Sequence, residues 1–146
     1  MDTALKQRIF AAICEESADA ILFADQRGNI QFWNKGAERI FGYTQAEAIG
    51  KSLDLIIPEK LQARHNEGYH GVMASGATKY GSDLLSVPAQ HKDGSRLFSD
   101  FSIAMVKDDD GRMLGVAAIM RDATAQKAAE KTLKERIKEL EAKQAG

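Results

Sequence analysis

The sequence has almost no cysteine, no long apolar run and almost no net charge, and each shortage excludes a class of protein. Cys14 is the only cysteine among 146 residues, which excludes an internal disulfide and a cysteine-based metal cluster. No stretch approaches the roughly 20 consecutive apolar residues of a membrane span. Residues 1–6 lack the basic and then apolar pattern of a secretory signal. We therefore expect a cytoplasmic protein with no membrane span in this segment.

Acidic and basic residues balance: 20 Lys and Arg against 21 Asp and Glu give a formal net charge of −1. This balance provides no electrostatic attraction to nucleic acid or to an anionic membrane, so neither is expected as a partner. The sequence also lacks a phosphate-binding loop, a nucleophile with its base and acid, and paired carboxylates. It is therefore predicted not to be an enzyme, and any kinase or cyclase activity would lie in another domain of a longer protein.

Hydrophobic residues make up 44% of the chain, enough for the core of one domain. Periodicity and turn residues predict five strands, over residues 20–24, 30–33, 84–90, 96–105 and 114–120. Helices are predicted over 2–16 and 58–76 and from 124 onward, with short helices over 37–41 and 44–49. Pro88 favours an edge position for its strand. This order predicts an α+β fold, a five-stranded antiparallel sheet with helices packed on one face and a flanking helix at each end.

The helix over 58–76 contains the most informative residues. Pro58 suits its first turn and Gly76 suits its end. Spacings of three and four residues place one histidine inside an otherwise apolar and aromatic face. This face consists of Leu61, His65, Tyr69, Val72 and Met73. The residues alone leave two interpretations of His65 open: a hydrogen-bonded core histidine, or a ligand of a bound cofactor.

Two further histidines and an acidic cluster are weaker metal signals. His70 follows His65 by five residues and so points to another side of the helix, where we expect it to be exposed. His91 precedes a Lys-Asp-Gly turn and is expected to face solvent. Because these side chains diverge, a zinc site of three histidines is not predicted. Residues 108–111 lack the length and the final Glu of a calcium loop, so a hairpin turn is predicted there.

Several short motifs, in order and at compatible spacing, resemble the PAS sensor domain family. They are Ser17-Ala-Asp-Ala-Ile, Asp25-Gln-Arg-Gly-Asn-Ile with Trp33-Asn34, Ala37-Glu-Arg-Ile-Phe-Gly-Tyr43, Glu47-Ala-Ile-Gly50, Lys92-Asp-Gly94 and Arg121-Asp-Ala-Thr124. The resemblance covers about residues 12–125 and implies the PAS fold. We expect an N-terminal cap helix over 1–16, a PAS domain over 17–124 and a truncated, coiled-coil-like signalling helix over 125–146.

Both flanking helices carry apolar stripes. The stripes consist of Leu5, Ile9 and Ile13 in the first helix and of Leu133, Ile137 and Leu140 in the last. Together with the family resemblance, they predict a homodimer formed through the flanking helices. A solvated last helix remains the alternative, because polar residues interrupt the seam upstream. In this family the Asp-x-Thr motif, here Asp122 and Thr124, marks the exit toward a downstream output domain.

The stretch Arg64-His65-Asn-Glu-Gly-Tyr69 resembles the segment around the proximal histidine of haem-containing, oxygen-sensing PAS kinases. The resemblance implies haem b with His65 as the axial iron ligand, since neutral imidazole is a standard proximal ligand. It implies a cofactor site lined by His65, Tyr69, Leu61, Val72, Met73, Lys79, Leu85, Phe101 and Ile103. In this site Phe101 and Ile103 would form an apolar distal wall, and Lys79 would pair with a propionate.

Two positions depart from those oxygen sensors. Leu85 stands where they carry an arginine that reaches bound oxygen, and Gly71 stands where they carry a propionate contact. A site without that donor favours carbon monoxide, nitric oxide or a redox role. Flavin is disfavoured, because the helix over 58–76 lacks the cysteine of light-sensing flavin PAS domains.

The sequence therefore predicts a signal-sensing PAS domain of a bacterial-type signal-transduction protein, with haem-based gas or redox sensing through His65. The alternative is a cofactor-free PAS module that dimerises or senses a small ligand and relays to an output domain. The cofactor-free module needs no ligand at His65, whereas the haem-based sensor needs iron there.

Overall fold

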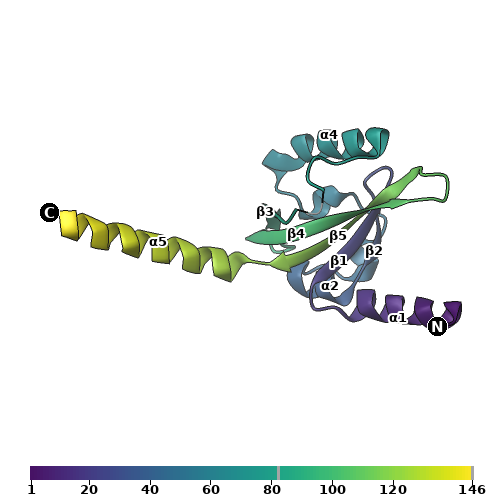
Figure 1. Cartoon of the computed structure of the whole chain (residues 1–146), viewed down its shortest axis with the longest axis horizontal. Coiled ribbons are helices and arrows are strands. Elements are labelled where there is room, and N and C mark those ends of the chain that lie inside the picture. Colours follow the sequence, from purple (N-terminus) through teal and green to yellow (C-terminus); the bar gives the residue numbers. More distant parts are fainter. Residues whose placement is uncertain (82, 146) are drawn as a thin grey trace.

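The computed structural model describes residues 1–81 and 83–145 and contains a five-stranded antiparallel sheet in the order β2-β1-β5-β4-β3 (Figure 1). The strands are β1 (Ala20–Asp25), β2 (Ile30–Trp33), β3 (Leu85–Gln90), β4 (Arg96–Lys107) and β5 (Met113–Asp122). All five strands were predicted from the sequence. The β4–β5 hairpin is longer than predicted, because pairing continues as far as Lys107 and Met113. Pro88 lies in edge strand β3, as expected.

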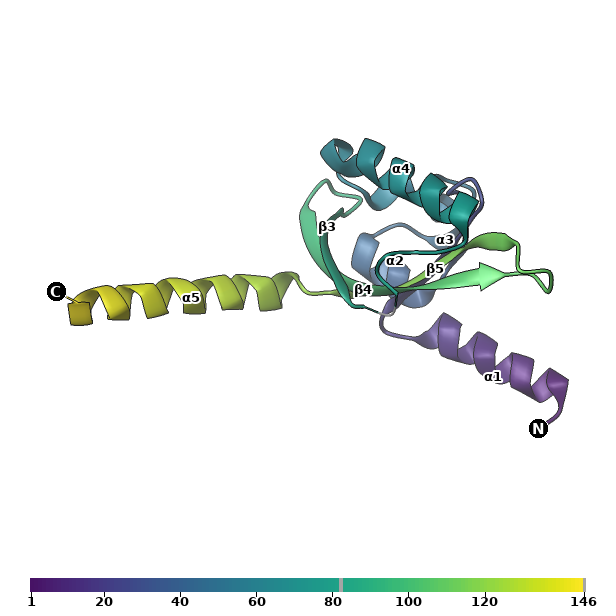
Figure 2. The same cartoon turned by 45° about the horizontal axis from the view of Figure 1, so that its top comes forward.

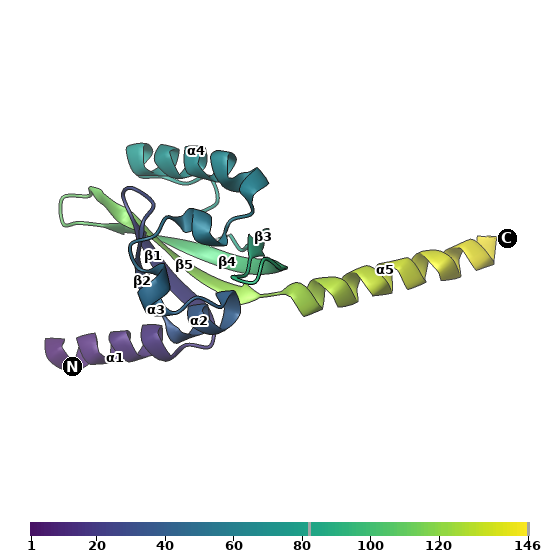
Figure 3. The same cartoon turned by 180° about the vertical axis from the view of Figure 1, so that it is seen from behind.

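Four helical segments follow β2, and the α+β prediction is confirmed. They are α2 (Lys35–Phe41), α3 (Gln45–Ala48), the 3-10 helix η1 (Leu53–Ile56) and α4 (Glu59–Ser75). Seen from behind, α4 lies across from the sheet, with η1 between them (Figure 3). The flanking helices α1 (Thr3–Glu16) and α5 (Thr124–Ala145) extend away from the sheet in different directions (Figure 2). Across residues 1–81 and 83–145, no helix has both the length and the apolar character to cross a membrane.

The core lies between one face of the sheet and the short helices. Its largest fully buried side chains include Trp33, Phe41 and Ile30. The rings of Trp33 and Phe41 lie 5.6 Å apart between centroids. The Trp33 indole donates from Nε1 to the Tyr43 carbonyl oxygen over 3.0 Å, so the buried ring leaves no unpaired donor.

Side chains and glycines at the helix ends satisfy the free backbone groups there. The Asn34 side chain accepts a hydrogen bond from Ala37 N at the start of α2. Thr44 and Glu47 form a capping box at the start of α3. Gly76 ends α4 with a φ of +69°, a conformation that side chains with a Cβ rarely adopt.

Candidate functional site

Tyr69 holds α4 to the sheet. Its hydroxyl donates to the carbonyl oxygens of Ala24 and Asp25 at the end of β1, which lie 2.9 and 2.6 Å away. The single phenolic proton is shared between these two acceptors. Burial raises the pKa of Tyr69 to about 12, so the hydroxyl keeps its proton at neutral pH. Tyr69 is therefore a link between α4 and β1, and its hydroxyl is not free to contact a ligand.

His65 lies one turn before Tyr69 and is half-buried, with the two ring centroids 6.1 Å apart. Its Nδ1 atom is buried and has no hydrogen-bond partner. Burial lowers the pKa of the imidazole, against the opposing effects of the Asn66 side chain and the Asp54 carboxylate. The ring is therefore neutral at physiological pH, the state in which one nitrogen offers a lone pair to a metal.

The sheet presents an apolar wall on its helix-covered face. Leu85, Phe101 and Met120 stand directly opposite one another on β3, β4 and β5, and Ile103 stands opposite Ala118. Directly paired residues share a face of a sheet, and Met120 and Ala118 are buried in the core. Leu85, Phe101 and Ile103 therefore point to this same side, yet all three are only half-buried. The two layers thus do not close completely over these side chains.

The remaining predicted site residues lie in different places. Leu61 and Val72 are half-buried on α4. Met73 lines a groove of about 560 Å³ between the end of α4 and the β4–β5 turn, together with His70, which is exposed as predicted. Lys79 is exposed after α4, with its ammonium 5.1 Å from the ring centroid of Tyr80. Among the residues that the structure describes, no three His, Cys, Asp or Glu side chains are grouped to hold a metal ion.

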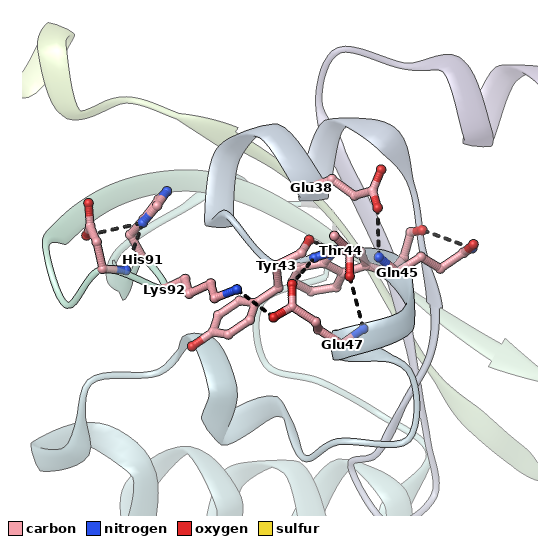
Figure 4. A network of polar contacts seen from close by, with 9 residues as sticks. Glu38, Tyr43, Thr44, Gln45, Glu47, His91 and Lys92 are labelled. Carbon is pink, nitrogen blue, oxygen red and sulfur yellow. Dashed lines mark hydrogen bonds and ion pairs between the residues drawn. The ribbon is translucent and has the colours of Figure 1, made fainter.

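The expectation that His91 faces solvent is wrong. Its side chain is 27% exposed. The imidazole packs so closely on Gly42 that a Cβ at that glycine would lie 2.5 Å from the ring. Lys92 N also donates to the Phe41 carbonyl oxygen over 2.9 Å. The β3–β4 turn therefore folds back onto the connection between α2 and α3, a long-range contact that no local pattern indicates (Figure 4).

Lys92 completes this junction with an ion pair. Its ammonium donates to Glu47 over 2.5 Å and lies 5.9 Å from the ring centroid of Tyr43 (Figure 4). The hydrogen bond from Lys92, followed by the Thr44 backbone, lowers the pKa of Glu47 to about 2. The pair is therefore charged at neutral pH. Both side chains are well exposed, so this network holds the turn in place and does not line a binding site.

Two polar residues, Gln62 and Asp54, join η1 to the helix of His65, and neither was predicted from the sequence. Gln62, three residues before His65 on α4, donates from Nε2 to the carbonyl oxygens of Asp54 and Ile57 over 3.3 and 3.0 Å. These bonds join η1 to α4. The Asp54 Oδ1 atom is buried without a partner. A single Asp before an apolar run is common in sequences, so this pattern did not indicate a functional role for Asp54.

The predicted exit motif joins the last strand to α5. Asp122 Oδ1 accepts hydrogen bonds from the backbone N and the hydroxyl of Thr124, at 2.9 and 2.5 Å. Thr124 Oγ1 in turn accepts from Phe98 N on β4 over 3.0 Å. Arg121 pairs with Asp19, just before β1, at 3.1 Å. The first residue of α5 is thus tied directly to the sheet.

This arrangement of sheet and helices is that of known sensory domains. The structure is similar to the PAS domain of a protein from Colwellia psychrerythraea, with a TM-score of 0.70 and 26% sequence identity, covering 84% of this chain and 98% of that one. The family model of the PAS domain matches residues 18–125. The chain belongs to the PAS domain family.

Two curated relatives are sensor proteins. The chain is 26% identical over 120 residues to the oxygen sensor protein DosP of Escherichia coli (strain K12), covering 82% of this chain and 15% of DosP. It is 40% identical over 48 residues to the sensor protein FixL of Bradyrhizobium diazoefficiens, covering 33% of this chain and 10% of FixL. The chain thus spans only a small part of each relative's length.

Proposed function

We propose that this chain is the sensory PAS module of a signal-transduction protein, that it binds haem b through His65, and that it responds to a diatomic gas or to redox state. The observation that carries this proposal is the His65 imidazole, which is neutral, half-buried and without a partner for its buried nitrogen. His65 would hold the haem, which would supply an iron able to bind a diatomic gas or to change its redox state. The similarity to the sensor proteins DosP and FixL supports this proposal.

Apolar side chains on α4 and on the sheet match the chemistry of a porphyrin face. Leu61 and Val72 on α4, and Phe101 and Ile103 on β4, are all half-buried. A flat apolar ring between them would remove this surface from water, which is favourable in proportion to its area. Tyr69 would hold α4 in place over the ring. Lys79, exposed after α4, would pair with a propionate.

The candidate hydrogen-bond donors on α4 and on the inner face of the sheet are already occupied. The Tyr69 hydroxyl is engaged with β1, and the buried Ser99 hydroxyl donates to the Val87 carbonyl oxygen over 3.3 Å. Leu85 has no hydrogen-bond donor. Because donors on the gas side of a haem decide how well oxygen is held, this site favours carbon monoxide, nitric oxide or a redox change over oxygen.

The exit motif provides a path for the signal. Phe101 and Phe98 lie on the same strand, and Phe98 N is bonded to Thr124 at the start of α5. A ligand that presses on the wall formed by Phe101 would move β4 and with it the first turn of α5. The output would then be read by a downstream domain.

A visible spectrum tests the haem proposal. The protein is expressed with haem available, purified and recorded in its oxidised, reduced and carbon-monoxide forms, and a Soret band that shifts between them is expected. His65→Ala should lose the band. His70→Ala is the matched control, because it removes the same residue type from an exposed position on the same helix. A missing band in the wild type, or an unchanged band in His65→Ala, contradicts the proposal.

A second candidate function is a cofactor-free module that dimerises or senses a small ligand. Both flanking helices expose large apolar side chains, and neither has a buried residue. On α1 these are Leu5 (48% exposed), Phe10 (54%) and Ile13 (60%); on α5 they are Leu133 (61%), Ile137 (45%) and Leu140 (45%). A second copy of the chain would cover both stripes and form a two-fold dimer. Such a dimer is also compatible with haem binding.

A further inference from the structure

Two buried polar atoms near α4 have no hydrogen-bond partner: His65 Nδ1 and Asp54 Oδ1. Among the residues that the structure describes, one other side-chain atom shares this condition, Asp100 Oδ1. Most buried polar atoms in proteins are paired, because an unpaired one costs about 1–3 kcal/mol. Two such atoms of complementary type on neighbouring elements therefore require an explanation.

Asp54 and His65 lie on two elements, η1 and α4, that the Gln62 side chain joins. The Ser52 hydroxyl accepts from Asp54 N over 3.1 Å at the start of η1. Gln62 binds the other side of this turn through the Asp54 carbonyl oxygen and stands one helical turn before His65.

We propose that Asp54 is a positioning residue for His65: its carboxylate accepts the hydrogen bond of Nδ1–H, directly or through one water molecule, and so leaves Nε2 as the nitrogen that binds a ligand. A neutral imidazole carries one proton, so a proton held at Nδ1 places the free lone pair on Nε2. A carboxylate behind a histidine also fixes the orientation of the ring and makes its other nitrogen a stronger metal ligand. This inference rests on the proposed function in one respect, the identity of iron as the ligand of Nε2.

The tautomer of His65 tests the inference without any haem. In ¹⁵N-labelled, haem-free protein, two-bond proton–nitrogen correlation spectra distinguish a protonated Nδ1 from a protonated Nε2, and His65→Ala assigns the signals. The wild type is expected to carry its proton on Nδ1. Asp54→Ala should shift the equilibrium toward a protonated Nε2. Glu59→Gln is the control, because it removes one negative charge from the exposed first turn of the same helix.

Should Asp54→Ala fail to fold, Asp54→Asn keeps the volume and the backbone bonds to Ser52 and Gln62. It should shift the tautomer part of the way. A wild type with its proton on Nε2 overturns the inference. The inference is also overturned if a folded Asp54 variant has the same His65 tautomer as the wild type.

The haem-loaded protein provides a second measurement. In Asp54→Ala, the iron–histidine stretching band of the ferrous protein should move to lower frequency, and haem affinity should fall by about 10- to 100-fold, as for other residues behind metal ligands. If Asp54→Ala binds haem and neither its iron–histidine band nor its His65 tautomer changes, Asp54 does not have the proposed role. The haem proposal then still stands. A tautomer that depends on Asp54 in a protein that binds no haem contradicts the haem proposal and leaves the role of Asp54 standing.

Discussion

The side-chain amide of Asn34 donates from Nδ2 to the carbonyl oxygen of Cys14 over 2.8 Å, across 20 residues of sequence. The same nitrogen donates to Asp19 O at 3.0 Å, and Oδ1 accepts from Ile21 N at 2.9 Å and Ala37 N at 2.8 Å. Asn34 is 3% exposed, so its side-chain amide is almost completely removed from water. One buried side chain thus joins the end of α1 to the start of β1 and of α2.

Asn34→Asp should destabilise the protein by about 2–4 kcal/mol, because a carboxylate cannot donate to the Cys14 and Asp19 carbonyl oxygens and leaves both buried acceptors unpaired. Urea unfolding followed by circular dichroism measures the change. Gln7→Glu makes the same chemical change on the exposed face of α1 and should alter stability little. Equal stability of Asn34→Asp and wild type would show that these bonds add nothing.

Tyr69→Phe should loosen α4 from the sheet. The variant keeps the ring but removes the hydroxyl that binds Ala24 and Asp25, at an expected cost of about 1–2 kcal/mol. Amide hydrogen exchange should become faster in α4 and stay unchanged in β5. Tyr80→Phe changes an exposed hydroxyl and is the control. Unchanged exchange in α4 would argue against Tyr69 as the link.

The Glu47–Lys92 pair should make stability depend on pH under acid conditions. The pKa of Glu47 is about 2 in the folded protein, below its ordinary value of 4.5. A lowered pKa means that the pair contributes stability above about pH 4.5 and loses it as the pH falls toward 2. The difference in urea midpoint between wild type and Glu47→Gln should therefore shrink from pH 6 to pH 3. Glu139→Gln on α5 should show no such trend, and a constant difference for Glu47→Gln would refute the assignment.

Leu85→Arg should increase the affinity of the haem-loaded protein for oxygen relative to carbon monoxide. A guanidinium at this position on the sheet wall would donate a charged hydrogen bond worth about 1.5–3 kcal/mol, or roughly 10- to 100-fold in affinity. Oxygen and carbon monoxide titrations of the ferrous protein measure the ratio. Leu85→Met changes shape without adding a donor and should leave it unchanged. An equal ratio in Leu85→Arg and wild type would place Leu85 away from the gas.

The apolar stripes of the flanking helices should determine the oligomeric state. Ile13→Glu combined with Ile137→Glu should convert a dimer to a monomer in multi-angle light scattering, because each buried charge would oppose association. Glu15→Gln combined with Glu135→Gln is the control on the same helices. A wild type that remains monomeric at high concentration would exclude the dimer.

Local patterns along the chain were enough to predict the order of the elements, the turns and the family. Asn34, the Thr44–Glu47 capping box and Gly76 are local signals, because each side chain acts on backbone groups within a few residues. The turn residues indicated the three hairpins, and Pro88 indicated an edge strand. The β1–β5 pairing, which completes the strand order, was not predicted from the sequence. The inward position of His65 on α4 likewise followed from helical spacing.

Which of these side chains have no hydrogen-bond partner depends on how the elements pack together. The Tyr69 hydroxyl is occupied by β1, more than 40 residues earlier in the chain, and His91 is packed against Gly42. Asp54 and His65 both retain a buried atom without a partner. These facts depend on distances between elements that are far apart in sequence, which periodicity does not encode. The physical reason is that hydrogen-bond satisfaction and burial are properties of the packed chain, whereas turns, caps and periodicity are properties of short segments.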